Sequence, residues 1–235
     1  MIISKFDLDY VIDPQARKFC GPLFFTRSLE TPVGTIPNNG SFGLIDTGER
    51  KLLVTCYHVW EAFKELRSQN PNFKFAVCLD MGNPVAMDVD SLLVDEDKRA
   101  DIVTFAMEEL LPVCGGLEFY NLQRSPAPKV NVGEMLFFIG FPGNGREVVN
   151  NQVGFPRQPC GVALTEVGTS FFYSDVTNLN KTADDFGGIS GCPCFAVREN
   201  RPLKLVGFAT GFALKRLSFT YASRIRPDGR IDSTM

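Results

Sequence analysis

The most informative stretch of the chain reads DDFGGISGCP, residues 184–193, and it places one serine, Ser190, on a glycine-rich turn before an apolar segment at 194–197. Glycine adopts backbone angles that other residues avoid, so the chain can turn sharply here and direct successive N–H groups at one point. A serine on such a turn is a candidate nucleophile, because the N–H groups of Gly188 and Ser190 can stabilise an oxyanion. Many ordinary surface turns share this pattern, so the hypothesis requires a base and an orienting acid elsewhere in the chain.

The base can be only one residue, because the chain of 235 residues contains a single histidine, His58. His58 follows a predicted strand at 51–55 and begins a stretch, 59–66, in which apolar residues recur at helical spacing. A side chain at such a junction can project outward while its backbone is anchored. The alternative is a histidine with a purely structural role or a histidine that is simply exposed.

The acid must be a carboxylate that holds the imidazole in one tautomer and stabilises its charged form. Asp101, which opens an apolar strand, is the best candidate. The alternative for Asp101 is a cap or turn residue. Asp95 and Asp97 are the rival carboxylates, but they lie inside the charged turn 95–99, where solvation is the simpler explanation.

Composition favours β-structure. The chain has 21 phenylalanines, many of them in short runs separated by glycine or proline. Residues 1 to about 20 are predicted to be a lead-in arm, and a regular strand pattern begins at Gly40. Many short strands with turn signals between them predict an all-β fold, either barrels or a sandwich. The proline- and glycine-rich segment 108–129 is predicted to connect two halves.

Charge, hydropathy and cysteines exclude several classes of function. A formal net charge of −3 argues against a nucleic-acid-binding protein. No window approaches 18 apolar residues, so no membrane span is expected, and the acidic N-terminal residues argue against a signal peptide. Seven cysteines are irregularly spaced, and the one close pair, Cys192 and Cys194, is a poor zinc or disulfide pattern. We therefore expect reduced thiols in a cytoplasmic protein, with no cofactor and no metal.

Three motifs occur in the order histidine, aspartate, serine: TCYHV at 55–59, ADIV at 100–103 and GISGCP at 188–193. Together they resemble the chymotrypsin/trypsin-like serine protease family, in which the motifs look like Thr-Ala-x-His, Asp-Ile-Ala and Gly-x-Ser-Gly-x-Pro. The separations, 43 residues from 58 to 101 and 89 from 101 to 190, suit that family. Segments 40–43, 139–143 and 205–211 extend the likeness over most of the chain.

The resemblance implies a fold of two antiparallel six-stranded β-barrels with the active site in the cleft between them. The N-terminal barrel, residues 1–115, would carry His58 and Asp101. The C-terminal barrel, residues 116–235, would carry Ser190.

The resemblance also implies a serine endopeptidase that acts through an acyl-enzyme on a protein or peptide substrate. Asp184, six residues before the serine, would select Arg or Lys; the rivals are a loop carboxylate and a pocket for small or apolar side chains. The edge formed by Ala209, Thr210 and Gly211 would pair with the substrate backbone.

One departure concerns activation. Secreted digestive members have an aspartate immediately before the serine, whereas this chain has Ile189, so activation by N-terminal cleavage is not expected. The chain looks more like the cytosolic bacterial or viral-type branch, and a protease in the cytoplasm is expected to need a regulatory protein partner. The alternatives are a catalytically inactive relative that binds a peptide or protein partner in the same cleft, and an unrelated all-β interaction protein.

Overall fold

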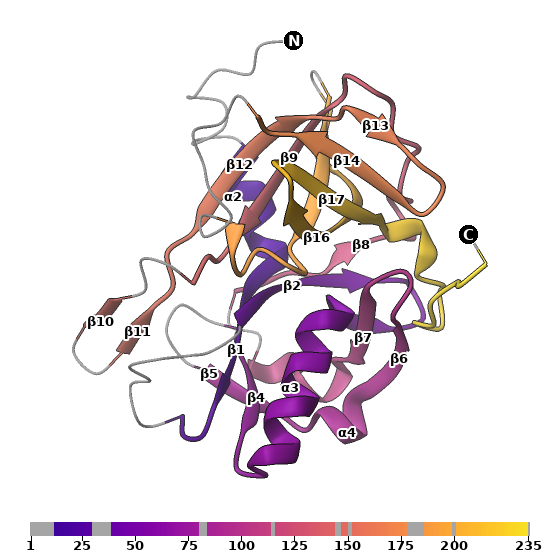
Figure 1. Cartoon of the computed structure of the whole chain (residues 1–235). Helices are drawn as coiled ribbons and strands as arrows, with labels where there is room; N and C mark the ends of the chain where they lie inside the picture. The colour runs from indigo at the N-terminus through magenta and orange to yellow at the C-terminus, as the bar shows by residue number, and fades with distance from the viewer. Residues whose placement is uncertain are drawn as a thin grey trace.

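Two curled, largely antiparallel sheets, stacked on one another, make up most of the described protein (Figure 1). The computed structural model describes residues 12–29, 39–79, 84–113, 116–143, 147–149, 152–177, 186–198 and 201–234. The all-β architecture of two barrel-like halves, predicted from the motifs, is confirmed.

The first sheet comes from the N-terminal half and has the strand order β5-β4-β1-β2-β3-β7-β6, with β8 parallel to β2. Its strands are β1 (Cys20–Thr26), β2 (Asn39–Asp46), β3 (Lys51–Thr55), β4 (Lys74–Cys78), β5 (Pro84–Met87), β6 (Leu93–Asp97), β7 (Ile102–Ala106) and β8 (Tyr120–Asn121). Within the described ranges this gives eight strands rather than six, because short segments such as β8 add to the sheet.

The second sheet has the order β12-β9-β15-β16-β17-β14-β13, seven strands among the residues described. They are β9 (Met135–Gly140), β12 (Gln158–Ala163), β13 (Glu166–Val167), β14 (Phe171–Asp175), β15 (Pro193–Val197), β16 (Lys204–Ala213) and β17 (Arg216–Tyr221). A separate hairpin of β10 (Glu147–Val149) and β11 (Gln152–Gly154) projects to one side (Figure 1).

The helices in the described ranges are short. The longest described helix, α3 (Tyr57–Gln69), buries Val59, Trp60 and Phe63 against the first sheet. The others are α2 (Asp13–Ala16), η2 (Arg17–Phe19), α4 (Val89–Leu92), η3 (Glu108–Val113) and η4 (Ala222–Arg224). None of the described helices has the length and apolar character needed to span a bilayer.

Apolar side chains form three cores, one belonging to each sheet and one between them. In the core between α3 and the first sheet, the rings of Phe63, Phe75 and Phe105 surround Trp60. The core between the sheets joins Ile45 and Leu52 of the first sheet to residues of the second, including Phe137, Phe195 and Leu205. Burying one such phenylalanine contributes about 1.5–3 kcal/mol. The shared core therefore fixes one sheet against the other, and with it the elements that carry the candidate site.

Residues 225–234 leave the second sheet and return to the first (Figure 1). Thr104 Oγ1 donates to Gly229 O at 2.8 Å, and Ile231 N donates to Asp95 Oδ2 at 2.8 Å. The predicted division at residues 115 and 116 stays a prediction. Two segments beyond it, β8 and residues 225–234, form hydrogen bonds with the first sheet.

Candidate active site

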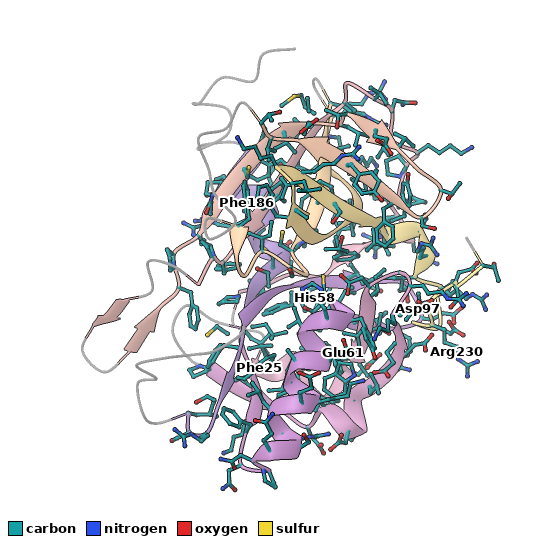
Figure 2. The ribbon with its side chains drawn as sticks, in the orientation of Figure 1. Phe25, His58, Glu61, Asp97, Phe186 and Arg230 are labelled. Carbon is teal, nitrogen blue, oxygen red and sulfur yellow. The ribbon has the colours of Figure 1, made fainter. Side chains whose placement is uncertain are left out.

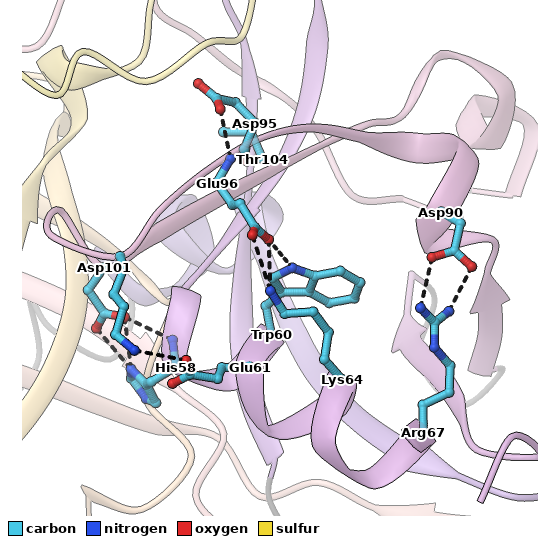
Figure 3. A network of polar contacts seen from close by, with 11 residues as sticks. His58, Trp60, Glu61, Lys64, Arg67, Asp90, Asp95, Glu96, Asp101 and Thr104 are labelled. Atoms are coloured by element: carbon cyan, nitrogen blue, oxygen red, sulfur yellow. Dashed lines mark hydrogen bonds and ion pairs between the residues drawn. The ribbon is translucent and has the colours of Figure 1, made fainter. Parts of the chain in front are cut away.

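His58 and Asp101 are in direct contact at the N-terminal end of α3 (Figure 3). The ring atom His58 Nδ1 lies 2.8 Å from Asp101 Oδ2 and 3.1 Å from Oδ1, and the backbone N–H of His58 donates to Oδ1 at 2.9 Å. With its proton on Nδ1 facing the carboxylate, the ring presents Nε2 as an acceptor. The His58 side chain is 49% exposed and that of Asp101 21%, so the pair is reachable from solvent. Asp101 thus fixes both the ring and the backbone of His58.

Asp101 takes up an unusual backbone conformation to reach this position. Its φ is +54°, in the left-handed region that costs a non-glycine residue about 1–2 kcal/mol. The turn before it is held by Asp97 Oδ1, which accepts the N–H groups of Arg99 at 2.7 Å and Ala100 at 2.9 Å. The rival carboxylates therefore have other partners, because Asp97 orders this turn and Asp95 binds the N–H of Ile231.

Ser190 is half-buried on a turn built by backbone conformation. Gly188 and Gly191, on either side of it, have φ of +98° and +94°. The N–H groups of Ile189, Gly191 and Cys192 donate to Phe186 O, Ala209 O and Ile189 O at 3.2, 2.8 and 2.9 Å. The N–H groups of Gly188 and Ser190 have no acceptor within the part of the chain that the structure describes. This is the pair that the sequence predicted as oxyanion donors, a role that stays a prediction.

Ser41 of β2 joins the serine turn to the first sheet. Its N–H donates to Ser190 O at 2.8 Å, and its hydroxyl donates to Gly188 O at 2.8 Å while accepting the N–H of Phe141 at 3.1 Å. Ser41 O in turn accepts the hydroxyl of Thr55 at 2.8 Å, three residues before His58. These bonds bring the backbone of Ser190 into the region of His58, which lies where the two sheets meet (Figure 2).

A methyl group placed at Gly40 shows how close the two regions are. It would lie 3.1 Å from Ser190 O and 3.1 Å from the side chain of Val59, which follows His58 in the chain. The carbonyl of Ser190 and the first turn of α3 are therefore neighbours. The structure thus brings the motifs of all three predicted residues together, with the direct side-chain contact between His58 and Asp101.

Cys56 is a member of this site that sequence reasoning missed. It is 1% exposed, and its thiol donates to Ala209 O at 3.1 Å. Cys56, His58 and Asp101 each offer one atom that could bind a metal, and these three atoms lie within 4.8 Å of one another. Burial, together with the carboxylate of Asp101, raises the pKa of the Cys56 thiol well above its ordinary value. The signal in the sequence was a cysteine where the family motif, Thr-Ala-x-His, has alanine.

The predicted substrate edge lies on β16. Its register with β15 ends at Phe208, so beyond that residue this edge has no strand partner in the described ranges. Thr210 is skipped in the register with β17, and its hydroxyl donates to Ser218 Oγ at 3.0 Å. The N–H and C=O of Ala209 already bond to Cys192 O and Gly191 N, and Gly211 O accepts the hydroxyl of Ser218 at 3.3 Å.

The predicted specificity residue, Asp184, lies outside the described residues. The nearest described residue to it in the chain, Phe186, is buried and packs against Phe212 with ring centroids 4.7 Å apart. An aromatic pair therefore adjoins the serine turn.

Comparison with solved structures finds the same fold elsewhere. The structure titled "Crystal structure of Rv3671c protease from M. tuberculosis, active form" matches with a TM-score of 0.58 at 13% sequence identity, over 94% of this chain and 84% of that one. Deg5 matches with a TM-score of 0.56 at 14% identity, over 92% of this chain and 90% of its own. Scans with models of known families and against curated sequences give no match. At these identities the likeness shows the fold alone, and that fold agrees with the two-sheet architecture that the sequence motifs predicted.

Proposed function

We propose that the protein is a serine endopeptidase that hydrolyses peptide bonds through an acyl-enzyme on Ser190. The observation that carries the proposal is the double hold of Asp101 on His58, through the ring and through the backbone N–H. The hydrogen bonds from Ser41 to the serine turn support it, because they hold that turn beside the histidine. The fold shared with the Rv3671c protease gives the proposal additional support.

The chemistry would proceed in two halves. Ser190 Oγ attacks the scissile carbonyl while His58 Nε2 accepts its proton, and Asp101 stabilises the resulting imidazolium. The N–H groups of Gly188 and Ser190 donate to the tetrahedral oxyanion, and one such donor contributes about 3 kcal/mol. His58 then delivers the proton to the leaving amine. A water molecule, deprotonated by the same ring, hydrolyses the acyl-enzyme and regenerates the serine.

The substrate would bind as an extended strand along the open edge of β16. Main-chain hydrogen bonds from Thr210 and Gly211 would hold it, as in other cases of strand addition. Ala209 would contribute by fixing this edge against the serine turn, because its own backbone groups are engaged there. Asp184 would select Arg or Lys next to the cleaved bond. A small or apolar preference is the rival, and the aromatic pair of Phe186 and Phe212 favours it.

A fluorophosphonate probe tests the enzyme directly, because it labels only an activated serine. We expect labelling of the wild type and none of Ser190→Ala, while Ser91→Ala, an exposed serine on α4, should label like the wild type. Loss of the nucleophile should lower kcat by roughly 10⁶. If the folded wild type is neither labelled nor able to cleave any peptide of a mixed library, the proposal of a serine endopeptidase fails, and the rival hypothesis of an inactive scaffold is favoured.

The same library tests specificity. Cleavage after Arg or Lys that disappears in Asp184→Ser would support the role of Asp184, whereas an unchanged preference would exclude it. Cleavage after apolar residues, altered in Phe212→Ala, would favour the rival pocket.

We also propose a cytoplasmic location and a regulatory protein partner. The location rests on the cysteine pattern, and alkylation of unreduced, denatured protein from cells should modify all seven thiols. The partner follows from the need to restrain a protease in that compartment, and affinity capture of Ser190→Ala with crosslinking tests it.

A further inference from the structure

Cys56, His58 and Asp101 bring a thiol, an imidazole and a carboxylate to one point. We propose that these three side chains bind a zinc-class divalent cation, and that the bound cation blocks the histidine. The binding stands on the geometry alone. The block rests on the proposed function, because it assumes that His58 is the base.

The donor set fits zinc. Zinc in proteins takes thiolate sulfur, imidazole nitrogen and carboxylate oxygen, and sites with three protein ligands keep a fourth position for water. The three ligand atoms lie within 4.8 Å of one another. Ligands at the usual zinc distances of about 2.0–2.3 Å are roughly 3.3–3.8 Å apart in a tetrahedron, so side-chain movements of about 1 Å would close the site.

Burial and charge are also suitable. Cys56 forms the closed inner side of the site, while His58 and Asp101 are partly exposed and give the ion a way in from solvent. A thiolate and a carboxylate together balance the two positive charges, so no net charge is buried. The thiol proton leaves to solvent as the sulfur–metal bond forms. Ala209 O loses the thiol hydrogen bond but keeps the one from the N–H of Gly191, so it is not left unpaired.

Binding at this point would remove the function of the imidazole. The nitrogen that faces Asp101 is Nδ1, and a cation there takes the place of its proton. The neutral ring then carries its one proton on Nε2. A protonated Nε2 cannot accept the proton of Ser190, and the carboxylate is bound to the metal instead of the ring.

Cys56 is the ligand that sets this chain apart. The motif of the family it resembles has alanine at position 56, and alanine supplies no ligand. In the described part of the chain, this is the one group of three or more metal-ligating side chains that converges in this way.

Cobalt chloride is a suitable first probe, because a cobalt–thiolate bond absorbs in the near ultraviolet. Titration of chelator-treated wild type should develop this absorption with one equivalent of Co²⁺, and ZnCl₂ should bleach it. Cys56→Ala should lose the band, with affinity reduced at least about tenfold. Cys78→Ala is the matched control, since Cys78 is a partly buried cysteine on β4 outside the cluster.

The wild-type spectrum tests metal binding without any variant, because absence of a cobalt–thiolate band would contradict the proposed site. A band that persists in folded Cys56→Ala, or in Cys56→Ser if the alanine variant is unstable, overturns it as well. The thermal melting of each variant is measured alongside.

Peptide hydrolysis separately tests whether the bound cation inhibits His58. Each rate is expressed relative to the same protein in chelator. Zinc at a concentration that lowers the wild-type rate at least tenfold should lower the rate of Cys56→Ala by less than twofold. Equal inhibition of both proteins, or Co²⁺ binding to the wild type without inhibition, overturns the block. If no protein hydrolyses peptide in chelator, the proposed function fails, while the spectra still decide the metal site.

Discussion

The two halves of the candidate site are built by different means. On the first sheet, side chains meet directly: the carboxylate of Asp101 binds the ring of His58. On the second sheet, backbone conformation shapes the site: Gly188 and Gly191 turn the chain around Ser190, and carbonyl and N–H groups hold it. On the first sheet, the His58–Asp101 contact should therefore be sensitive to a change of functional group. On the second sheet, the turn around Ser190 should be sensitive to an added atom.

Among the variants that test this comparison, the largest effect is expected from Asp101→Asn. Asparagine tolerates the φ of +54° and can still accept the N–H of His58, so the fold should survive. Its amide group disfavours the required tautomer, and the corresponding change in a Ser-His-Asp triad lowers kcat about 10⁴-fold. Steady-state kinetics on a peptide substrate, with circular dichroism to verify folding, measure this.

Asp95→Asn is the control for that experiment, because Asp95 binds the N–H of Ile231 rather than the histidine. It should keep kcat within about threefold of the wild type. An equal loss in both variants would mean that the contact between Asp101 and His58 has no special part in the reaction.

Gly191→Ala should show the sensitivity of the turn around Ser190. Its φ of +94° is strained for alanine, and the added Cβ would lie 2.2 Å from Ser41 O and 2.4 Å from Thr55 Oγ1. We expect a loss of about 3 kcal/mol or more in the free energy of unfolding, together with loss of probe labelling. Urea unfolding and labelling rates measure both.

Gly133→Ala separates the backbone strain of a positive φ from the steric clash of an added Cβ. Gly133 has a similar φ of +85°, but a Cβ there would meet nothing within 4 Å. It should lose only about 1–2 kcal/mol and keep its labelling rate. If both variants lose the same stability, the close approach of Ser41 to the turn is not important.

Ser41→Ala tests the link between the two halves. It removes a buried hydroxyl that serves both Gly188 O and the N–H of Phe141, and we expect about 2 kcal/mol of destabilisation and slower labelling. Ser174→Ala is the matched control, since the fully buried hydroxyl of Ser174 has no hydrogen-bond partner among the described residues. Similar melting temperatures for the two variants would contradict the prediction.

The smallest effect concerns Asp97, whose turn precedes Asp101. Burial opposes the ionised form, but hydrogen bonds from Ser233 and from the N–H groups of Ala100 and Arg99 prevail, so the pKa of Asp97 is lowered. A lowered folded-state pKa means that this stabilisation is complete above the unfolded pKa of about 3.9 and is lost as the pH falls through the folded value. Asp97→Asn should therefore be less stable than the wild type by about 1–2 kcal/mol at pH 7.

That difference should shrink below about pH 4, as the wild type becomes protonated. Urea unfolding of both proteins at pH 7 and near pH 3 measures it. A difference that stays constant with pH would show that the charge of Asp97 contributes nothing.

The sequence predicted the two-sheet fold and the contact of His58 with Asp101 because order and spacing of motifs carry long-range information. It missed β1, which lies between β4 and β2, because Gly21 and Pro22 are residues typical of turns. Gly21 is needed there for packing: a Cβ would lie 2.5 Å from the ring of Phe42. The contribution of Cys56 was missed for a different reason: its neighbours Asp101 and Ala209 come from distant parts of the chain.

The return of residues 225–234 to the first sheet has a consequence for the order of events during synthesis on the ribosome. The strands on either side of the turn that carries Asp101 bind this segment, through Thr104 to Gly229 and Asp95 to Ile231. A nascent chain in which this segment is still inside the exit tunnel lacks those bonds. We therefore expect the turn that carries Asp101 to be fully braced, and the proposed activity to be acquired, only after release of residues 225–234.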